Sequence, residues 1–172
     1  MRTIGILLLF LIATVLERTF FAGLSGGVAA MNVAAVIVIV RMTMLSRRGL
    51  VLWITAAACA AELFSQSIFG AAALGILVGC ATARIALLSL FSHRAFFPRT
   101  VCAAIGLVVG AFAEAGVRLT SGVVDPIDMA LGRAATGALQ IAGWDILLAA
   151  ALLAAAALLR RTLGSVLKPL AT

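Results

Sequence analysis

Residues 50–91 have the sequence LVLWITAAACAAELFSQSIFGAAALGILVGCATARIALLSLF. Two apolar runs, residues 50–63 and 68–91, are joined through ELFSQSIFG (62–70), which contains one acid and a few hydroxyl and amide groups. The second run alone exceeds the roughly 18 apolar residues that indicate a membrane-spanning helix. The pattern predicts a tight transmembrane hairpin with a carboxylate, that of Glu62, near its tip.

The rest of the chain has the same apolar character. Of its 172 residues, 65% are hydrophobic, whereas a soluble globular protein is nearer half apolar. A water-soluble domain of this size cannot cover so much apolar surface, so the expected solvent is lipid. The net charge is +7, from 13 basic and 6 acidic residues, and the basic residues flank the apolar runs. Because they form no stripe, membrane orientation explains them better than nucleic-acid binding.

The apolar runs predict an all-α integral membrane protein, a single domain in which six transmembrane helices with short loops form a compact bundle. The expected helices cover residues 3–21, 28–45, 50–65, 69–91, 100–119 and 139–159. A short helix over 126–133 is expected on the membrane surface, with Asp125 as its cap and Pro126 at its first position. The N-terminal apolar run imitates a signal peptide but is followed by no small-residue cleavage site, so we interpret it as an uncleaved first helix.

The distribution of basic residues predicts the orientation. With six helices and a cytoplasmic N-terminus, ten basic residues fall on the cytoplasmic side and three, Arg18, Arg118 and Arg133, on the outer side. This is the bias of the positive-inside rule. We therefore expect both termini in the cytoplasm and the acidic residues on or toward the outside.

Two groups of residues are candidates for a functional role. Glu62 is either a solvated carboxylate at a helix end or a contact point for a partner's extracytoplasmic segment. Gly106, Gly110, Glu114 and Arg118 follow one another at four-residue spacing and form one helical stripe. This stripe is either plain helix packing with a local ion pair or a docking face for another protein's helix. Gly75 and Gly79 form a second such glycine pair.

The sequence gives no positive reason to expect an enzyme. The only histidine, His93, lies in a basic turn with no cysteine or acid nearby. The three cysteines lie within apolar runs and lack metal-ligand spacing, so free thiols, no metal and no cofactor are expected. Asn32 could bond a neighbouring helix or lie at the interface.

Residues 17–118 resemble the MreD family, small integral membrane proteins of the bacterial cell-elongation machinery. The resemblance rests on a basic turn (RRG, 47–49), an alanine-rich helix (56–61), an acid followed by a short turn (ELFS, 62–65) and the pair Phe69–Gly70. The chain departs from the family pattern in two places: Glu62 stands where aspartate is usual, and Ile68 replaces a proline.

The resemblance implies a non-enzymatic scaffold of cell-shape determination and peptidoglycan synthesis in the bacterial inner membrane. Its expected partners are membrane lipid, the single-pass protein MreC and other elongation proteins. Gly75, Gly79, Gly106 and Gly110 are then candidates for packing against the partner's helix. The outer-side groups Glu62, Glu114, Arg118 and Asp125 are polar candidates, of which Glu62 and Asp125 are expected to touch the partner's extracytoplasmic part. Association of the chain with copies of itself stays open.

Two other classes remain. The fold is also similar to that of the vitamin-binding subunits of energy-coupling factor transporters. Those subunits need a polar, aromatic outer pocket, and this chain has no tyrosine and two tryptophans. An ion or proton transporter would need polar groups at mid-membrane, for which Asn32 and Glu114 are the candidates.

Overall fold

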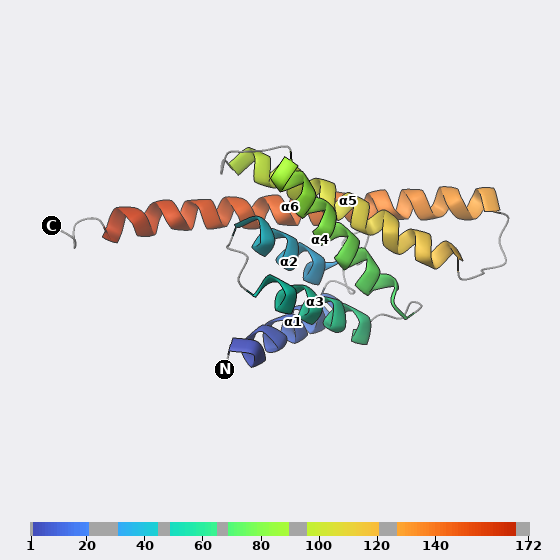
Figure 1. Cartoon of the computed structure of the whole chain (residues 1–172), viewed down its shortest axis with the longest axis horizontal. Coiled ribbons are helices and arrows are strands. Elements are labelled where there is room, and N and C mark those ends of the chain that lie inside the picture. The colour runs from blue at the N-terminus through green and yellow to red at the C-terminus, as the bar shows by residue number, and fades with distance from the viewer. Residues whose placement is uncertain are drawn as a thin grey trace.

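The computed structural model describes residues 2–20, 31–44, 49–64, 69–89, 96–120 and 127–167, and these ranges contain six α-helices (Figure 1). The prediction of an all-α protein is confirmed for this part of the chain. The helices are α1 (Arg2–Thr19), α2 (Val33–Met44), α3 (Leu50–Phe64), α4 (Ala71–Ser89), α5 (Phe96–Thr120) and α6 (Ile127–Leu167).

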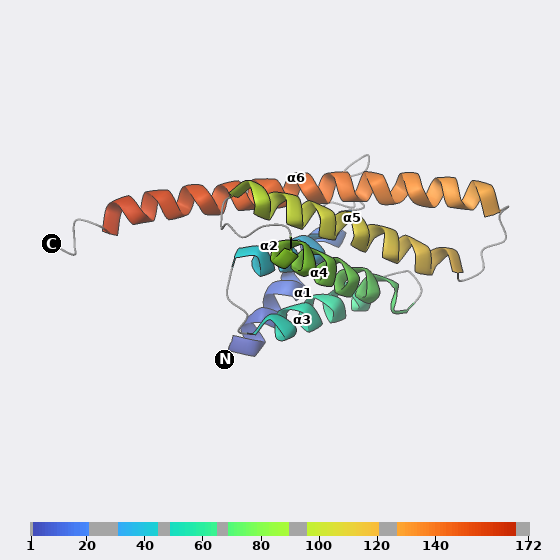
Figure 2. The ribbon, with the colours of Figure 1, turned by 45° about the horizontal axis from the view of Figure 1, so that its top comes forward.

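Successive helices run in alternating directions. In Figures 1 and 2, α1, α3 and α5 run from left to right, while α2, α4 and α6 return from right to left. The start of α1 and the end of α6 therefore lie at the same end of the bundle. We call this the terminal end and the other the hairpin end, where α3 gives way to α4 and α5 to α6.

Three of the described helices are long and apolar enough to cross a membrane: α4, residues 97–120 of α5, and residues 131–159 of α6. The apolar parts of α1, α2 and α3 are shorter, at 10–17 residues each. Helix α6 has 41 residues, which corresponds to about 60 Å of helix. That is roughly twice the thickness of a hydrocarbon core, and Figure 2 shows α6 extending beyond the other helices at both ends.

The structure corrects the expected bounds of three helices, one of which is α5: it begins at Phe96 instead of near residue 100. Residues 127–167 form one continuous helix, where the sequence predicted a surface helix over 126–133 and a separate span over 139–159. The alanine-rich segment contains no proline between Pro126 and Pro169, so nothing in it forces a break. Helix α2 begins at Val33 instead of near residue 28, because Asn32 caps it.

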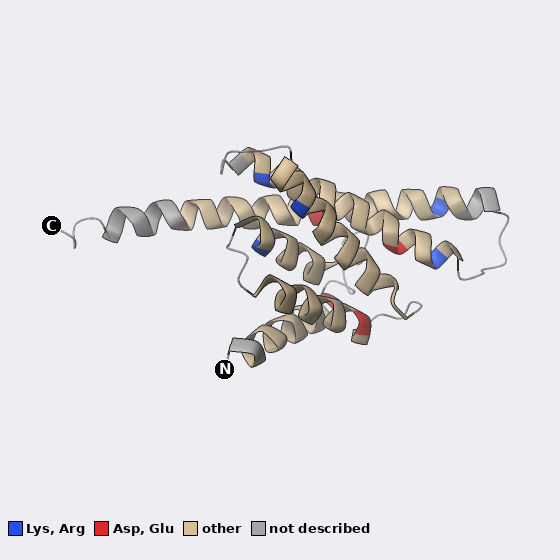
Figure 3. Ribbon diagram, viewed as in Figure 1, with Lys and Arg blue, Asp and Glu red and all other residues tan. Residues whose placement is uncertain are grey.

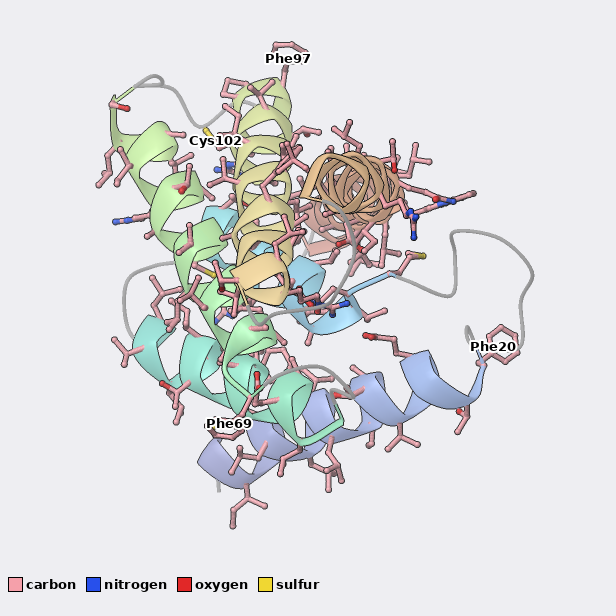
Figure 4. All side chains as sticks on the ribbon, turned by 90° about the vertical axis from the view of Figure 1, so that its right-hand side faces the viewer. Phe20, Phe69, Phe97 and Cys102 are labelled. Carbon is pink, nitrogen blue, oxygen red and sulfur yellow. The ribbon has the colours of Figure 1, made fainter. Side chains whose placement is uncertain are left out.

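The core consists mainly of small residues, which bring the helices close together. Alanines of α2, α3 and α4 are buried, and Phe10, Ile39, Ile76 and Leu153 are the largest side chains closed off from solvent. Many large apolar side chains instead point outward, and in Figure 4 Phe20, Phe69 and Phe97 extend away from the bundle. An apolar exterior over a core of small residues is the pattern of a helix bundle surrounded by lipid.

Candidate functional site

The start of α2 is the most polar place in the described interior. Asn32 immediately precedes the helix, and its Oδ1 accepts a hydrogen bond from the backbone N–H of Ala35 at 3.0 Å. This is the geometry of an N-cap, in which a side-chain oxygen satisfies one of the free N–H groups of the first turn.

Two carboxylates from other helices complete this cap. Asp145 Oδ1 of α6 accepts from the backbone N–H of Asn32 at 2.9 Å. Glu17 Oε2 of α1 accepts from the backbone N–H of Val33, also at 2.9 Å. Free N–H groups and the helix dipole make a helix start positive, so both carboxylates are stabilised there. The cluster Glu17–Asn32–Asp145 thus connects α1, α2 and α6, and we call it the α2 clamp.

Asp145 is the most deeply buried of these groups, with 3% of its surface exposed. It lies halfway along the apolar segment 131–159 of α6. The expected last helix, residues 139–159, would have placed Asp145 near its start, but the helix begins at Ile127. An ionisable side chain at such a depth is costly and is commonly functional.

A small cavity adjoins the α2 clamp. Its volume of about 20 Å³ is enough for one water molecule, and its polar lining comes from Asn32, Glu114 and Asp145. The glycine faces of α4 and α5 form much of the remaining wall. A carboxyl group beside such a cavity can exchange a proton with a water molecule held there, so the site is chemically suited to proton or water binding.

Glu62 has a clear structural partner. Its Oε1 accepts from the backbone N–H of Gly70, and its Oε2 accepts from that of Ala73 at 3.1 Å. Gly70 directly precedes α4 and has a φ of 96°, a conformation that favours glycine. The acid and the Phe69–Gly70 pair therefore work together: the carboxylate of α3 caps α4 and closes the hairpin. Both carboxylate oxygens of Glu62 therefore accept hydrogen bonds from within the chain.

The four candidate glycines face one another between α4 and α5. A Cβ atom placed on Gly79 would lie 2.7 Å from the backbone oxygen of Gly106, and one on Gly110 would lie 2.7 Å from that of Gly75. Of the two roles predicted, the structure shows helix packing within the chain. The other role, a docking face of the stripe for another protein's helix, stays a prediction.

The polar end of the same stripe lies near the hairpin end. Arg118 Nη2 donates to Glu114 Oε1, the one-turn ion pair that the spacing predicted. The two residues line a groove of about 360 Å³ between α5 and α6, together with Arg133 and several small or apolar residues. Asp125, the remaining outer-side candidate, lies outside the described residues.

Glu17 and Asp145 were not predicted from the sequence as site residues. Asn32 was the available signal, since an asparagine followed by an apolar helix indicates a cap. The carboxylates come from positions 15 residues before and 113 residues after it, so their convergence depends on tertiary packing. Comparison with family models, curated proteins and solved structures finds no match to this chain.

Proposed function

We propose that the chain is a multi-pass protein of the bacterial inner membrane, with all six helices crossing and both termini in the cytoplasm. The alternating directions of the helices support this arrangement (Figures 1 and 2). So does the placement of charge: in Figure 3 the basic segments of α2, α4 and the start of α5 lie toward the terminal end. The acidic segments of α3 and α5 lie toward the hairpin end.

Thiol labelling tests the orientation. Ser89 ends α4 at the terminal end, Thr120 ends α5 at the hairpin end, and both are exposed. On a background without native cysteines, Thr120→Cys should react in intact spheroplasts with a membrane-impermeant maleimide. Ser89→Cys should react only after the membrane is opened. The reverse pattern, or equal labelling, would contradict the proposed topology.

We further propose that the protein is a scaffold of the cell-elongation machinery, as the resemblance of residues 17–118 to the MreD family implies. The observation that carries this proposal is the outward face of α1. Helix α1 packs mainly on α3 and α2, and most of its leucine and isoleucine side chains are exposed, among them Leu8, Leu11, Ile12 and Leu16. A broad apolar face of this kind can accept the single membrane helix of a partner such as MreC.

The α2 clamp has a defined part in this scaffold. Glu17 joins α1 to the start of α2, and Asp145 joins that start to α6. The clamp therefore fixes the proposed docking helix against the longest helix of the bundle. A non-enzymatic scaffold needs this kind of fixed geometry, because its work is to hold partners in place.

Co-purification tests the scaffold. Leu8→Trp and Ile12→Trp enlarge neighbouring positions on the exposed face of α1 and should lower the recovery of tagged MreC. Leu147→Trp makes the same type of change at an exposed position of α6 and serves as the control. Unchanged recovery with both α1 variants would refute the docking face.

Two observations support alternative functions. The groove between α5 and α6 supports a vitamin-binding subunit of an energy-coupling factor transporter, since its volume is in the range of small-molecule sites. Tight binding of a purified vitamin would establish that alternative.

The buried Asp145 and its cavity support a proton or ion transporter. Proton flux in liposomes that is lost in Asp145→Asn would establish that one.

A further inference from the structure

Arg41 lies in the last turn of α2, at the terminal end of the bundle. Its Cζ is 5.0 Å from the centroid of the Trp53 ring, near the start of α3. The Trp53 ring is in turn held by Phe10, at a centroid distance of 5.7 Å and an interplanar angle of 78°. Phe10 is fully buried. The guanidinium group therefore rests on an aromatic ring whose own position is fixed by the core.

The charge of Arg41 has no counter-ion among the residues that the structure describes. Its Nη1 atom is buried and has no hydrogen-bond partner there. Glu17 and Asp145 bind the start of α2, which lies about 13 Å of helix away from Arg41. Nη1 is closed off from an incoming ligand, but the positive charge is delocalised over the whole guanidinium group. The open side of that group is therefore suited to an anion.

Two further acids, Glu62 and Glu114, have side chains that the structure describes, and both have partners elsewhere. Glu62 binds the start of α4 at the hairpin end, and Glu114 pairs with Arg118. The counter-ion that Arg41 needs must then come from outside the described residues.

We propose that Arg41 and Trp53 form a binding site for the phosphate headgroup of an anionic phospholipid. Arg41 is only half-buried, so part of its planar donor fork stays open, and that fork matches the oxygens of a phosphate group. Tryptophan is a residue type found at headgroup depth. Basic segments of α4 and of the start of α5 add positive charge toward the same end (Figure 3).

Quenching by brominated lipids tests the site on the full-length chain. Trp144→Phe leaves Trp53 as the single fluorescent tryptophan. This variant is incorporated into phosphatidylcholine vesicles that contain either brominated phosphatidylglycerol or brominated phosphatidylcholine. We expect Trp53 to associate with the anionic lipid with a preference of about fivefold, the effect of one arginine at a membrane surface. Equal quenching by the two lipids would overturn the proposal, whatever the variants do.

Three further variants distinguish a specific guanidinium site from a general attraction between positive charge and anionic lipid. Arg41→Gln should abolish the preference, and Arg41→Lys should lose most of it because lysine lacks the planar fork. Arg118→Gln removes the same charge at the hairpin end and should leave the preference unchanged. Full retention of the preference by Arg41→Lys would overturn the guanidinium site in favour of general electrostatics. Circular dichroism of each variant in the same vesicles verifies that the helices are intact.

The source of the phosphate group is tested with inorganic phosphate. Added to the same vesicles at matched ionic strength, it should not displace the brominated phosphatidylglycerol. Displacement would overturn the assignment to lipid. The proposal depends on the proposed membrane location but not on the scaffold role. Flotation of the vesicles measures membrane insertion separately, so a failure of lipid selectivity is distinct from a failure of the membrane proposal.

Discussion

The contact between α4 and α5 makes a strong prediction about Gly79. In Gly79→Ala, the new Cβ would lie 2.7 Å from the backbone oxygen of Gly106 and 3.4 Å from the Cα of Gly110. Both neighbours are backbone atoms, so no side chain can rotate away and the two helices must separate. Overpacking of this kind typically costs about 1–3 kcal/mol. We expect the free energy of unfolding to fall by that amount.

Gly116 of α5 provides the matched control. A Cβ atom there would meet nothing within 4 Å, and alanine is the better helix former. Gly116→Ala should therefore leave stability unchanged or raise it slightly. Unfolding in mild detergent by added dodecyl sulfate, followed by circular dichroism, measures both variants. A Gly79→Ala protein as stable as the wild type would refute the close packing of these helices.

The remaining predictions concern the caps and use the same unfolding measurement. Gly70→Ala should lower the free energy of unfolding by about 1–2 kcal/mol, since alanine is strained at a φ of 96°. Gly143→Ala in α6, where a Cβ atom meets open space, should not lower it. Equal effects of the two substitutions would contradict this reasoning. Glu62→Ala should cost about 1 kcal/mol, because two N–H groups at the start of α4 lose their acceptor. Asp145→Leu should cost about 1–3 kcal/mol by leaving the Asn32 N–H unpaired in the interior. If it is neutral, the α2 clamp is unimportant for stability.

Much of the helical architecture could be predicted from sequence because long apolar runs bounded by charged and turn residues favour helices. Long apolar runs predicted the positions of α4 and α5 closely. The four-residue spacing of Glu114 and Arg118 predicted their ion pair. The glycine pairs were recognised as close-packing positions, but sequence spacing shows only that they share a face. Which helix covers that face depends on the path of the chain in three dimensions.

The α2 clamp shows the other limit of sequence reasoning. Asp145 is surrounded in sequence by apolar residues and a tryptophan, a pattern equally typical of a helix end at the membrane surface. Its burial depends on α6 starting at Ile127 and on α2 starting at Val33, directly after Asn32. Both starts carry a local cap signal, Asn32 in one case and Asp125 in the other. What the sequence does not show is that the second helix continues past residue 133, since alanine-rich segments continue a helix as readily as they connect two.

The length of α6 has a mechanical consequence. The helix packs along α5 and α2 over several turns of its middle part, where Ala138, Ala142, Ala149 and Leu153 are buried. An extended contact of this kind holds the helix in one direction, whereas a single bond would let it tilt. The part beyond Leu153, about 21 Å of helix, then acts as a stiff spacer that sets a constant distance between the bundle and whatever the tip of α6 touches.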